Sequence, residues 1–318
     1  MALLLSAMLA AAAPPVALRR LIHDTRAITR RDGDALWPGF ARIPFHMILV
    51  ERRGETLFCH APLAGFRPLR RDAVTGCTMQ QRPRANPLDI SAAFPVADEP
   101  AMIVVGAPAR PGSERARWAI EVAHEAFHQY QARLPDYAAK VQALGLAGSS
   151  GDGAWMLDYP FPYAQPAVEA AFAAMCGRAL AFLQALTPAA RRQAIAAYVA
   201  ARHQARAAVS PADWRYYEFQ IGQEGVARWT DVMLAQAAAR RDPRYKGVAR
   251  DRLEGVASSL KAVMRQGLRV WKRGAFYELG AVEAMMLDSG GPGWRAAYRD
   301  KPFGIGDQLD AMVSPPPA

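Results

Sequence analysis

The residues His124-Glu125-Ala126-Phe127-His128 lie within an unbroken run, residues 113–134, that contains no glycine or proline. A Pro-Gly pair precedes this run and a proline follows it at once, so the sequence predicts a single helix. Residues four positions apart in a helix lie on the same face, one turn from each other. The imidazoles of His124 and His128 are therefore spaced to bind one metal ion, with the carboxylate of Glu125 beside them.

Two histidines do not complete a catalytic metal site, since a catalytic zinc ion has three protein ligands and one open position. None of the other histidines follows His128 at the short spacing of the three-histidine class, so a carboxylate is the expected third ligand. Glu224 is the best candidate, and Glu218, six residues earlier on the same predicted helix, is its rival. His203 lies in an Ala- and Arg-rich helix and is expected to be a surface residue. The other histidines are His23, His46, His60 and His203.

Two later segments join the HExxH motif in the order found in a known superfamily. They are Gln223-Glu-Gly-Val-Ala-Arg-Trp-Thr-Asp231 and Tyr277-Glu-Leu-Gly-Ala281. With these motifs the chain, over residues 101–298, resembles the gluzincin metallopeptidases related to aminopeptidase N and the glycyl aminopeptidases. The resemblance implies that a single zinc ion is bound by His124, His128 and Glu224. It also implies that Glu125 acts as the general base and that the Tyr277 hydroxyl donates a hydrogen bond to the tetrahedral oxyanion.

The chain departs from the superfamily pattern in two places. Glu224 follows His128 by 96 residues, much further than in aminopeptidase N, which implies inserted helices. The chain also has no Gly-x-Met-x-Asn segment, which aminopeptidase N uses beside the substrate amine, so aminopeptidase activity in particular is not implied. Tyr216 and Tyr217 are rivals to Tyr277 for the oxyanion role, and a buried core tyrosine is the simpler reading of any of them.

The expected function is zinc-dependent hydrolysis of peptide bonds in a peptide or protein substrate. Zinc lowers the pKa of its bound water, and Glu125 transfers the water's proton to the leaving amine. The strand predicted over 102–106 is expected to form a thermolysin-like sheet edge over the active-site helix, where it would hydrogen-bond the substrate backbone. The alternative is an exported, non-catalytic zinc-binding or interaction protein with a peptidase-like fold. Glu125 argues against that alternative, because a pure metal binder does not need this base.

Composition excludes several classes of protein. The chain has 318 residues, a formal net charge of +10 and a hydrophobic fraction of 52%, which fits one large or two small globular domains. Arginine supplies almost all of the basic charge, 34 Arg against 5 Lys. Several arginines occur as doublets, but these are scattered along the chain without a reading motif or interleaved aromatic residues. Nucleic-acid binding is therefore not expected.

The N-terminus carries a candidate targeting segment. Residues 1–13 resemble the apolar region and small-residue cleavage site of a short signal peptide, although no basic residue precedes them and two prolines follow. We expect an exported protein, periplasmic or secreted, with no stable membrane span in the rest of the chain. Cys59 and Cys77 could form a disulfide in that setting, and Cys176 is expected to be buried.

The expected fold class is α+β, with a small N-terminal sheet followed by a mostly helical region. Residues 20–110 are expected to be β-rich, with a hairpin over 45–51 and 55–60 and an irregular stretch over 61–100. Residues 111–313 should form the helical metallopeptidase part. Its aromatic-rich loop, residues 148–166, is either a binding loop or a surface connection. Helices are predicted near 166–185, 188–207, 211–240, 250–267 and 274–288, and residues 314–318 as a disordered tail.

Overall fold

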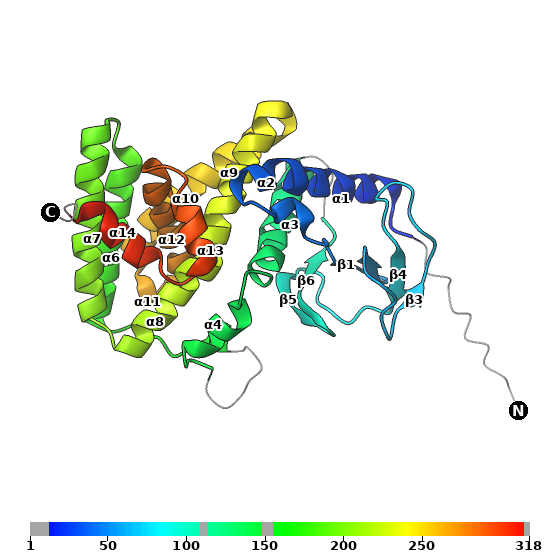
Figure 1. Ribbon diagram of the computed structural model, residues 1–318, viewed down its shortest axis with the longest axis horizontal. Coiled ribbons are helices and arrows are strands. Elements are labelled where there is room, and N and C mark those ends of the chain that lie inside the picture. The colour runs from blue at the N-terminus through cyan, green and yellow to red at the C-terminus, as the bar shows by residue number, and fades with distance from the viewer. Residues whose placement is uncertain (1–12, 109–112, 148–154, 315–318) are drawn as a thin grey trace, which may run out of the picture. The chain divides into compact units, whose positions relative to one another are not determined.

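The computed structural model describes residues 13–108, 113–147 and 155–314, and the chain divides into two compact units, Met1–Gln129 and Tyr130–Ala318. A six-stranded sheet lies in the first unit, whereas the second unit is built from helices (Figure 1). This arrangement confirms the predicted α+β class. The predicted signal segment, residues 1–13, and the predicted tail, residues 314–318, lie outside the described residues apart from one residue of each.

The first unit contains the strands β1 (Met47–Glu51), β2 (Gly54–Phe58), β3 (Arg67–Pro68), β4 (Met79–Arg82), β5 (Ser91–Val96) and β6 (Glu99–Gly106). Their order across the sheet is β3-β4-β2-β1-β6-β5. β1 and β2 form the predicted hairpin, antiparallel with Met47 opposite Phe58. β6 lies parallel to β1 on its other side, with Met47 opposite Ile103. The ends of three strands from distant parts of the sequence therefore meet at one side of the sheet.

The prediction that residues 102–106 form a sheet edge was wrong, because β6 lies between β1 and β5. Every side chain from Ala101 to Val105 is buried, as expected of an inner strand covered on both faces. β5 forms the edge on that side instead. It is partly exposed, contains Pro95 and shifts its register between Phe94 and Val96, and sheets tolerate such features at their edges.

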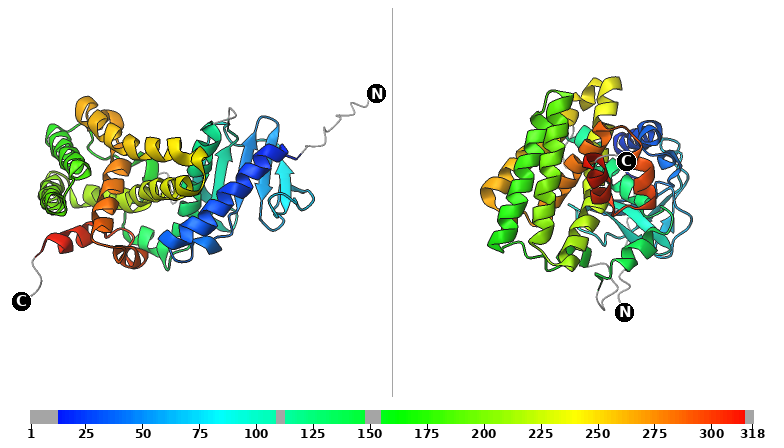
Figure 2. Two further views of the ribbon diagram at one scale, coloured as in Figure 1. Left: turned by 90° about the horizontal axis from the view of Figure 1, so that it is seen from above. Right: turned by 60° about the vertical axis from the view of Figure 1, so that its left-hand side comes forward.

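A helix that was not predicted, α1 (Val16–Ile28), lies beside the strands of the first unit (Figure 2). It buries Leu21 and Ile22, which have helical spacing with Ile28, so this periodicity could have revealed the helix. Its Arg19 forms an ion pair with Asp72 in the loop before β4. The short helical turns η1 (Thr29–Gly33), α2 (Asp34–Leu36) and η2 (Phe40–Arg42) follow α1 before the chain enters the sheet.

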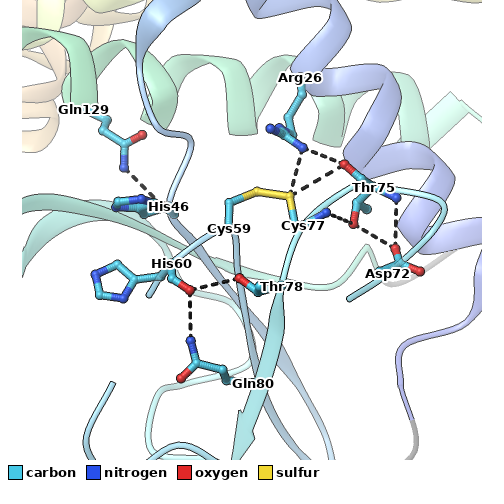
Figure 3. Close-up of a disulfide and its surroundings, with 10 residues drawn as sticks. All are labelled: Arg26, His46, Cys59, His60, Asp72, Thr75, Cys77, Thr78, Gln80 and Gln129. Atoms are coloured by element: carbon cyan, nitrogen blue, oxygen red, sulfur yellow. Dashed lines mark hydrogen bonds between the residues drawn. A yellow bond between two sulfur atoms is a disulfide. The ribbon is translucent and has the colours of Figure 1, made fainter. Parts of the chain in front are cut away.

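A disulfide joins Cys59, just after β2, to Cys77, just before β4, which confirms the pairing suggested by the sequence. Arg26 of α1 donates hydrogen bonds to the Cys77 sulfur over 2.9 Å and to the carbonyl of Thr75 over 2.7 Å (Figure 3). Helix α1, the end of β2 and the loop before β4 are therefore tied together at the disulfide.

Helix α3 (Ser113–Gln131) contains the HExxH motif and follows β6, as predicted. Trp118 Nε1 donates to the carbonyl of Gly106, the last residue of β6, over 2.7 Å. Near the other end of the helix, Gln129 Nε2 donates to the carbonyls of His46 and Ala101 over 3.1 and 2.9 Å. Gln129 is fully buried, where unmade hydrogen bonds are costly. These bonds therefore fix the orientation of α3 relative to β1 and β6.

The second unit contains every helix predicted after residue 165, although the one predicted over 211–240 is interrupted at residues 221–225. Several helices lie between His128 and Glu224, as the long spacing led us to expect. Helices α6 and α7 lie side by side (Figure 1). The elements are α4 (Tyr137–Ala143), α5 (Trp155–Asp158), α6 (Pro166–Gln184), α7 (Pro188–Ala207), α8 (Pro211–Gln220), η3 (Ile221–Gly225), α9 (Val226–Arg241), η4 (Pro243–Tyr245), α10 (Lys246–Gln266), α11 (Leu268–Trp271), α12 (Gly274–Ser289), α13 (Trp294–Asp300) and α14 (Ile305–Val313).

Among the described residues, α6 is the one helix whose length and composition would suffice to cross a membrane. A core helix produces the same pattern, and α6 buries Val168, Phe172, Met175 and Cys176. It contacts α7 and α10 within the second unit. Part of the apolar surface of α6 is thus used in packing between helices. Cys176 is buried, as predicted.

Candidate metal centre

The two histidines of α3 face each other across one helical turn. Their Nε2 atoms are 3.2 Å apart, and their ring centroids are 4.8 Å apart with an angle of 81° between the ring planes. His128 is buried, whereas His124 is partly exposed. The helix therefore brings two imidazole nitrogens together on one side, as the spacing predicted.

Glu125, between the two histidines in sequence, is buried and contacts the edge strand. Ser91, the first residue of β5, donates a hydrogen bond from its hydroxyl to Glu125 Oε1 over 3.1 Å. This contact holds the carboxylate of Glu125 at the start of β5. The edge of the sheet and the HExxH motif are thus linked by β5 rather than by β6.

Glu224 lies in a helical segment that departs from α-helical geometry. The structure forms α8, then the π-helical turn η3, then α9, where the sequence predicted one continuous helix over 211–240. A π turn inserts an additional residue into a helix, and such turns are frequent at functional sites. The insertion in η3 changes the direction in which the Glu224 side chain leaves the helix.

Tyr277 of α12 and Arg273, the residue just before α12, lie next to Glu224 within the second unit. The Tyr277 hydroxyl donates to the Glu224 carboxylate, and Arg273 donates in turn to the Tyr277 oxygen. Burial and the negative charge of Glu224 raise the pKa of Tyr277 above its ordinary value, although Arg273 opposes the shift. Tyr277 therefore remains a protonated hydrogen-bond donor at neutral pH. Arg273 was not singled out in the sequence, where it lies one helical turn before Tyr277.

Two glycines allow α12 to approach η3. A Cβ atom built on Gly225 would lie 2.5 Å from the Cα of Gly280, and one built on Gly280 would lie 2.7 Å from the Cα of Gly225. Real Cβ atoms do not come this close to other atoms. The backbones of η3 and α12 are therefore in direct contact, and this contact places Tyr277 beside Glu224.

The rival residues have structural partners in the second unit. Glu218 accepts a hydrogen bond from Arg202 over 2.5 Å. Tyr217 donates to the fully buried Glu283 over 2.8 Å, and Tyr216 donates to the carbonyl of Met156 over 3.1 Å. These contacts belong to the packing of α5, α7, α8 and α12, which favours Glu224 and Tyr277 over their rivals. His203 is exposed and pairs with Asp310 over 2.9 Å, in keeping with a surface position.

A cavity of about 610 Å³ opens beside Tyr277 within the second unit. The aromatic loop that precedes α6 forms one wall, and the segment from α11 to the start of α12 forms the other. Volumes of about 300–1,000 Å³ with aromatic linings are typical of sites that bind small molecules or side chains. The described part of the 148–166 loop therefore borders a cavity. The lining includes Tyr159, Phe161, Tyr163, Trp271, Arg273 and Tyr277.

Two sets of side chains among the described residues could hold a metal ion. One is the predicted set, His124, His128 and Glu224. Its histidines belong to the first unit and its glutamate to the second, so we treat their joint binding of one ion as a proposal. The other set, His46, His60 and Glu99, lies entirely in the first unit and was not predicted. The sequence could have indicated this set, because His46 and His60 lie at the two ends of the predicted hairpin.

No family model, curated protein or solved structure matches the chain. The resemblance to the gluzincin metallopeptidases consequently rests on the three sequence motifs and on the geometry around them. The identity of a bound metal rests on the chemistry of its ligands.

Proposed function

We propose that the protein is a zinc-dependent peptidase in which His124, His128 and Glu224 bind one zinc ion. The observation that supports this most directly is the distance of 3.2 Å between the Nε2 atoms of the two histidines. Zinc bonds to nitrogen or oxygen are about 2.0–2.2 Å long, which places two ligand atoms of a tetrahedral site about 3.3–3.6 Å apart. The pair on α3 is close to that spacing.

The continuity of α3 supports Glu224 as the third ligand. Gln131, the last residue of α3, belongs to the second unit and donates from Nε2 to the carbonyls of Gly222 and Gln223 over 3.1 and 2.9 Å. His128 precedes Gln131 by three residues on the same helix, a rise of about 5 Å. Within the second unit, Glu224 therefore directly follows the two residues whose carbonyls Gln131 contacts. Its carboxylate would complete a set of two nitrogens and one oxygen, which suits zinc.

When bound, zinc would supply a Lewis acid that acidifies water and polarises a carbonyl oxygen. In the proposed reaction, Glu125 accepts the proton of the attacking water and passes it to the amine that leaves. The hydrogen bond from Ser91 orients the Glu125 carboxylate through one of its two oxygens. Tyr277 donates a hydrogen bond to the oxyanion, and Arg273 holds the Tyr277 oxygen in position.

The proposed substrate is a peptide or a protein segment in extended conformation. β5 is an edge strand, and an extended chain can add to such an edge by main-chain hydrogen bonds. Because Ser91 begins β5 and contacts Glu125, a chain paired with β5 would run past the proposed general base. The aromatic lining of the cavity beside Tyr277 suits a large apolar or aromatic side chain of the substrate.

The proposal is tested by digestion of a peptide library, with and without a metal chelator, followed by mass spectrometry. We expect chelator-sensitive cleavage by the wild-type protein. Glu125→Gln should lower the rate by about 10²–10⁴-fold while zinc content is unchanged. Glu114→Gln, in the first turn of the same helix, is the matched control and should cleave normally. Normal turnover by Glu125→Gln would remove Glu125 from the mechanism. A folded, zinc-loaded wild-type protein that cleaves nothing would instead favour the non-catalytic zinc-binding alternative.

A further inference from the structure

We propose that the first unit contains a second metal site, in which His46, His60 and Glu99 bind a divalent transition-metal ion of the zinc class. The ligand atoms of these three residues all lie within 4.8 Å of one another. The set belongs wholly to one compact unit and shares no residue with the proposed catalytic centre. Its function would be to hold the ends of three strands together.

The sheet topology brings the three residues to one place. His46 immediately precedes β1, His60 follows β2 by two residues, and Glu99 is the first residue of β6. The antiparallel pairing of β1 with β2 brings His46 and His60 together, and their ring centroids are 4.6 Å apart. The parallel pairing of β6 with β1 directs the start of β6 toward the same end of the sheet.

The distances among the three side chains suit a shared ion. Glu99 Oε1 lies 2.8 Å from His46 Nδ1 and 3.6 Å from His60 Nε2. Ligand atoms around a tetrahedral zinc ion are about 3.3–3.6 Å apart, so the distance to His60 falls within this range. The distance to His46 is that of a hydrogen bond, and it would lengthen by about 0.5–0.8 Å when an ion replaces the shared proton. The three side chains are 14–16% exposed. An ion can therefore reach the site from solvent, while the ligands are already partly desolvated.

The main chain on both sides of His60 is held firmly. The carbonyl of His60 accepts hydrogen bonds from Thr78 Oγ1 over 3.0 Å and Gln80 Nε2 over 3.1 Å (Figure 3). The preceding residue, Cys59, is tied to Cys77 by the disulfide. His60 is thus fixed by covalent and hydrogen-bonded contacts to the loop before β4 and to β4 itself. A preformed ligand of this kind lowers the entropic cost of binding an ion.

His46 is held in a comparable way. Its carbonyl accepts hydrogen bonds from the Ile103 amide and from Gln129 Nε2, each over 3.1 Å. Gln129 lies on α3, one residue after His128. The main chain that positions the second set therefore also contacts the helix with the predicted pair. An ion bound at the strand ends would reinforce the support of that helix.

An ordinary ion pair does not account for the second set as well as a metal ion does. His203 and Asp310 form such a pair elsewhere in the chain, on an exposed surface and with one imidazole. Glu99 instead lies beside two imidazole nitrogens, and the rings are in edge-to-face contact. Two imidazoles and one carboxylate form a donor set found in zinc sites.

The test is a metal count on the full-length protein after removal of the predicted pair by His124→Ala/His128→Ala. Purified in the presence of zinc and then desalted, this variant should retain about one zinc ion per chain, and cobalt substitution should give it visible absorption bands. Adding His60→Ala should abolish both signals. Adding His203→Ala, which removes a histidine beside a single carboxylate, should leave both unchanged.

The two metal sites can be judged separately in this experiment. If the double variant holds no metal while the wild-type protein holds about one ion, the second site does not exist. If metal is lost with His60→Ala alone and not with the double variant, the second site stands and the proposed catalytic centre fails. In case His60→Ala does not fold, His60→Gln and Glu99→Gln serve as substitutes, with circular dichroism as the check of folding. Zinc should raise the Tm of the double variant, and this rise should vanish in the substitutes.

Discussion

The two histidine pairs of the first unit reach similar geometry by different means. His124 and His128 are neighbours on one helix, and the helical turn alone sets their separation. His46 and His60 come from two strand ends, where the hairpin pairing, the disulfide and side-chain hydrogen bonds set their separation. A helix provides local spacing regardless of the rest of the fold, whereas the strand-end pair exists only in a folded sheet. The helical pair therefore tolerates loss of the sheet contacts better than the strand-end pair does.

The strongest test of this comparison is to remove Glu224, the carboxylate that we propose binds an ion together with the helical pair. Glu224→Ala should weaken zinc binding at that pair by more than the roughly 10–100-fold typical of residues that only support a ligand, and should abolish hydrolysis. Zinc titration in a His60→Ala background isolates the affected site. Glu254→Ala, at an exposed position on α10, is the control. Unchanged affinity in Glu224→Ala would reassign the ligand, and Glu218 would then be the residue to replace next.

A smaller effect is expected from Tyr277→Phe, which keeps the ring and removes the hydroxyl. If the hydroxyl stabilises the oxyanion, kcat should fall by about 10²–10³-fold while zinc affinity stays constant. If the hydroxyl only orients Glu224, zinc affinity should fall by about 10–100-fold. Parallel measurement of kcat and zinc affinity separates these outcomes. A variant with both values unchanged would exclude Tyr277 from either role.

The smallest expected effect is a loss of folding stability when Glu55, in the sheet that supports the strand-end pair, is replaced. The buried Glu55 of β2 accepts hydrogen bonds from Arg82, the Ala85 amide and the Asn86 amide. Burial alone would raise the pKa of Glu55, but these hydrogen bonds outweigh it and hold the pKa below its ordinary value. Glu55→Gln replaces one acceptor oxygen with a donor group that faces other donors. Urea unfolding at neutral pH should show a loss of about 1–3 kcal/mol.

The pH dependence of this effect has a definite sign. Because the folded pKa of Glu55 is lowered, its contribution to stability is present above the unfolded pKa of about 4.3 and is lost as pH falls through the folded pKa. The difference between wild type and Glu55→Gln should therefore shrink in acid. Glu51 of β1 provides the opposite control, since burial raises its pKa, and Glu51→Gln should be neutral or stabilising at pH 7. A constant difference across pH would exclude the Glu55 charge as the cause.

The same contrast between local spacing and long-range contacts explains which parts of the structure could be predicted from the sequence. The helical pair was predictable because one local spacing defines it, and the long helices of the second unit were predictable from apolar periodicity and their capping residues. The proximity of His46 and His60 could be derived from the hairpin. The position of Glu99 could not, because it depends on the parallel pairing of β6 with β1 across more than forty residues.

Two further features lacked a sequence signal strong enough to predict them. β5 was hidden because Pro95 and its polar surroundings resemble a loop, and its strand conformation depends on pairing with β6. The π turn at Glu224 was hidden because no residue type specifies one extra residue in a helical turn. In both places tertiary contacts override the local preference.

The contact between Gly225 and Gly280 limits how this chain can vary. Only hydrogen atoms separate the two backbones, so a methyl group at either position would act as a wedge between η3 and α12. Such a wedge would move the Tyr277 hydroxyl away from Glu224 without altering either residue. A homologue with alanine at one of these positions would therefore need a compensating shift of the whole of helix α12. Without that shift, we expect the contact between Tyr277 and Glu224 to be lost.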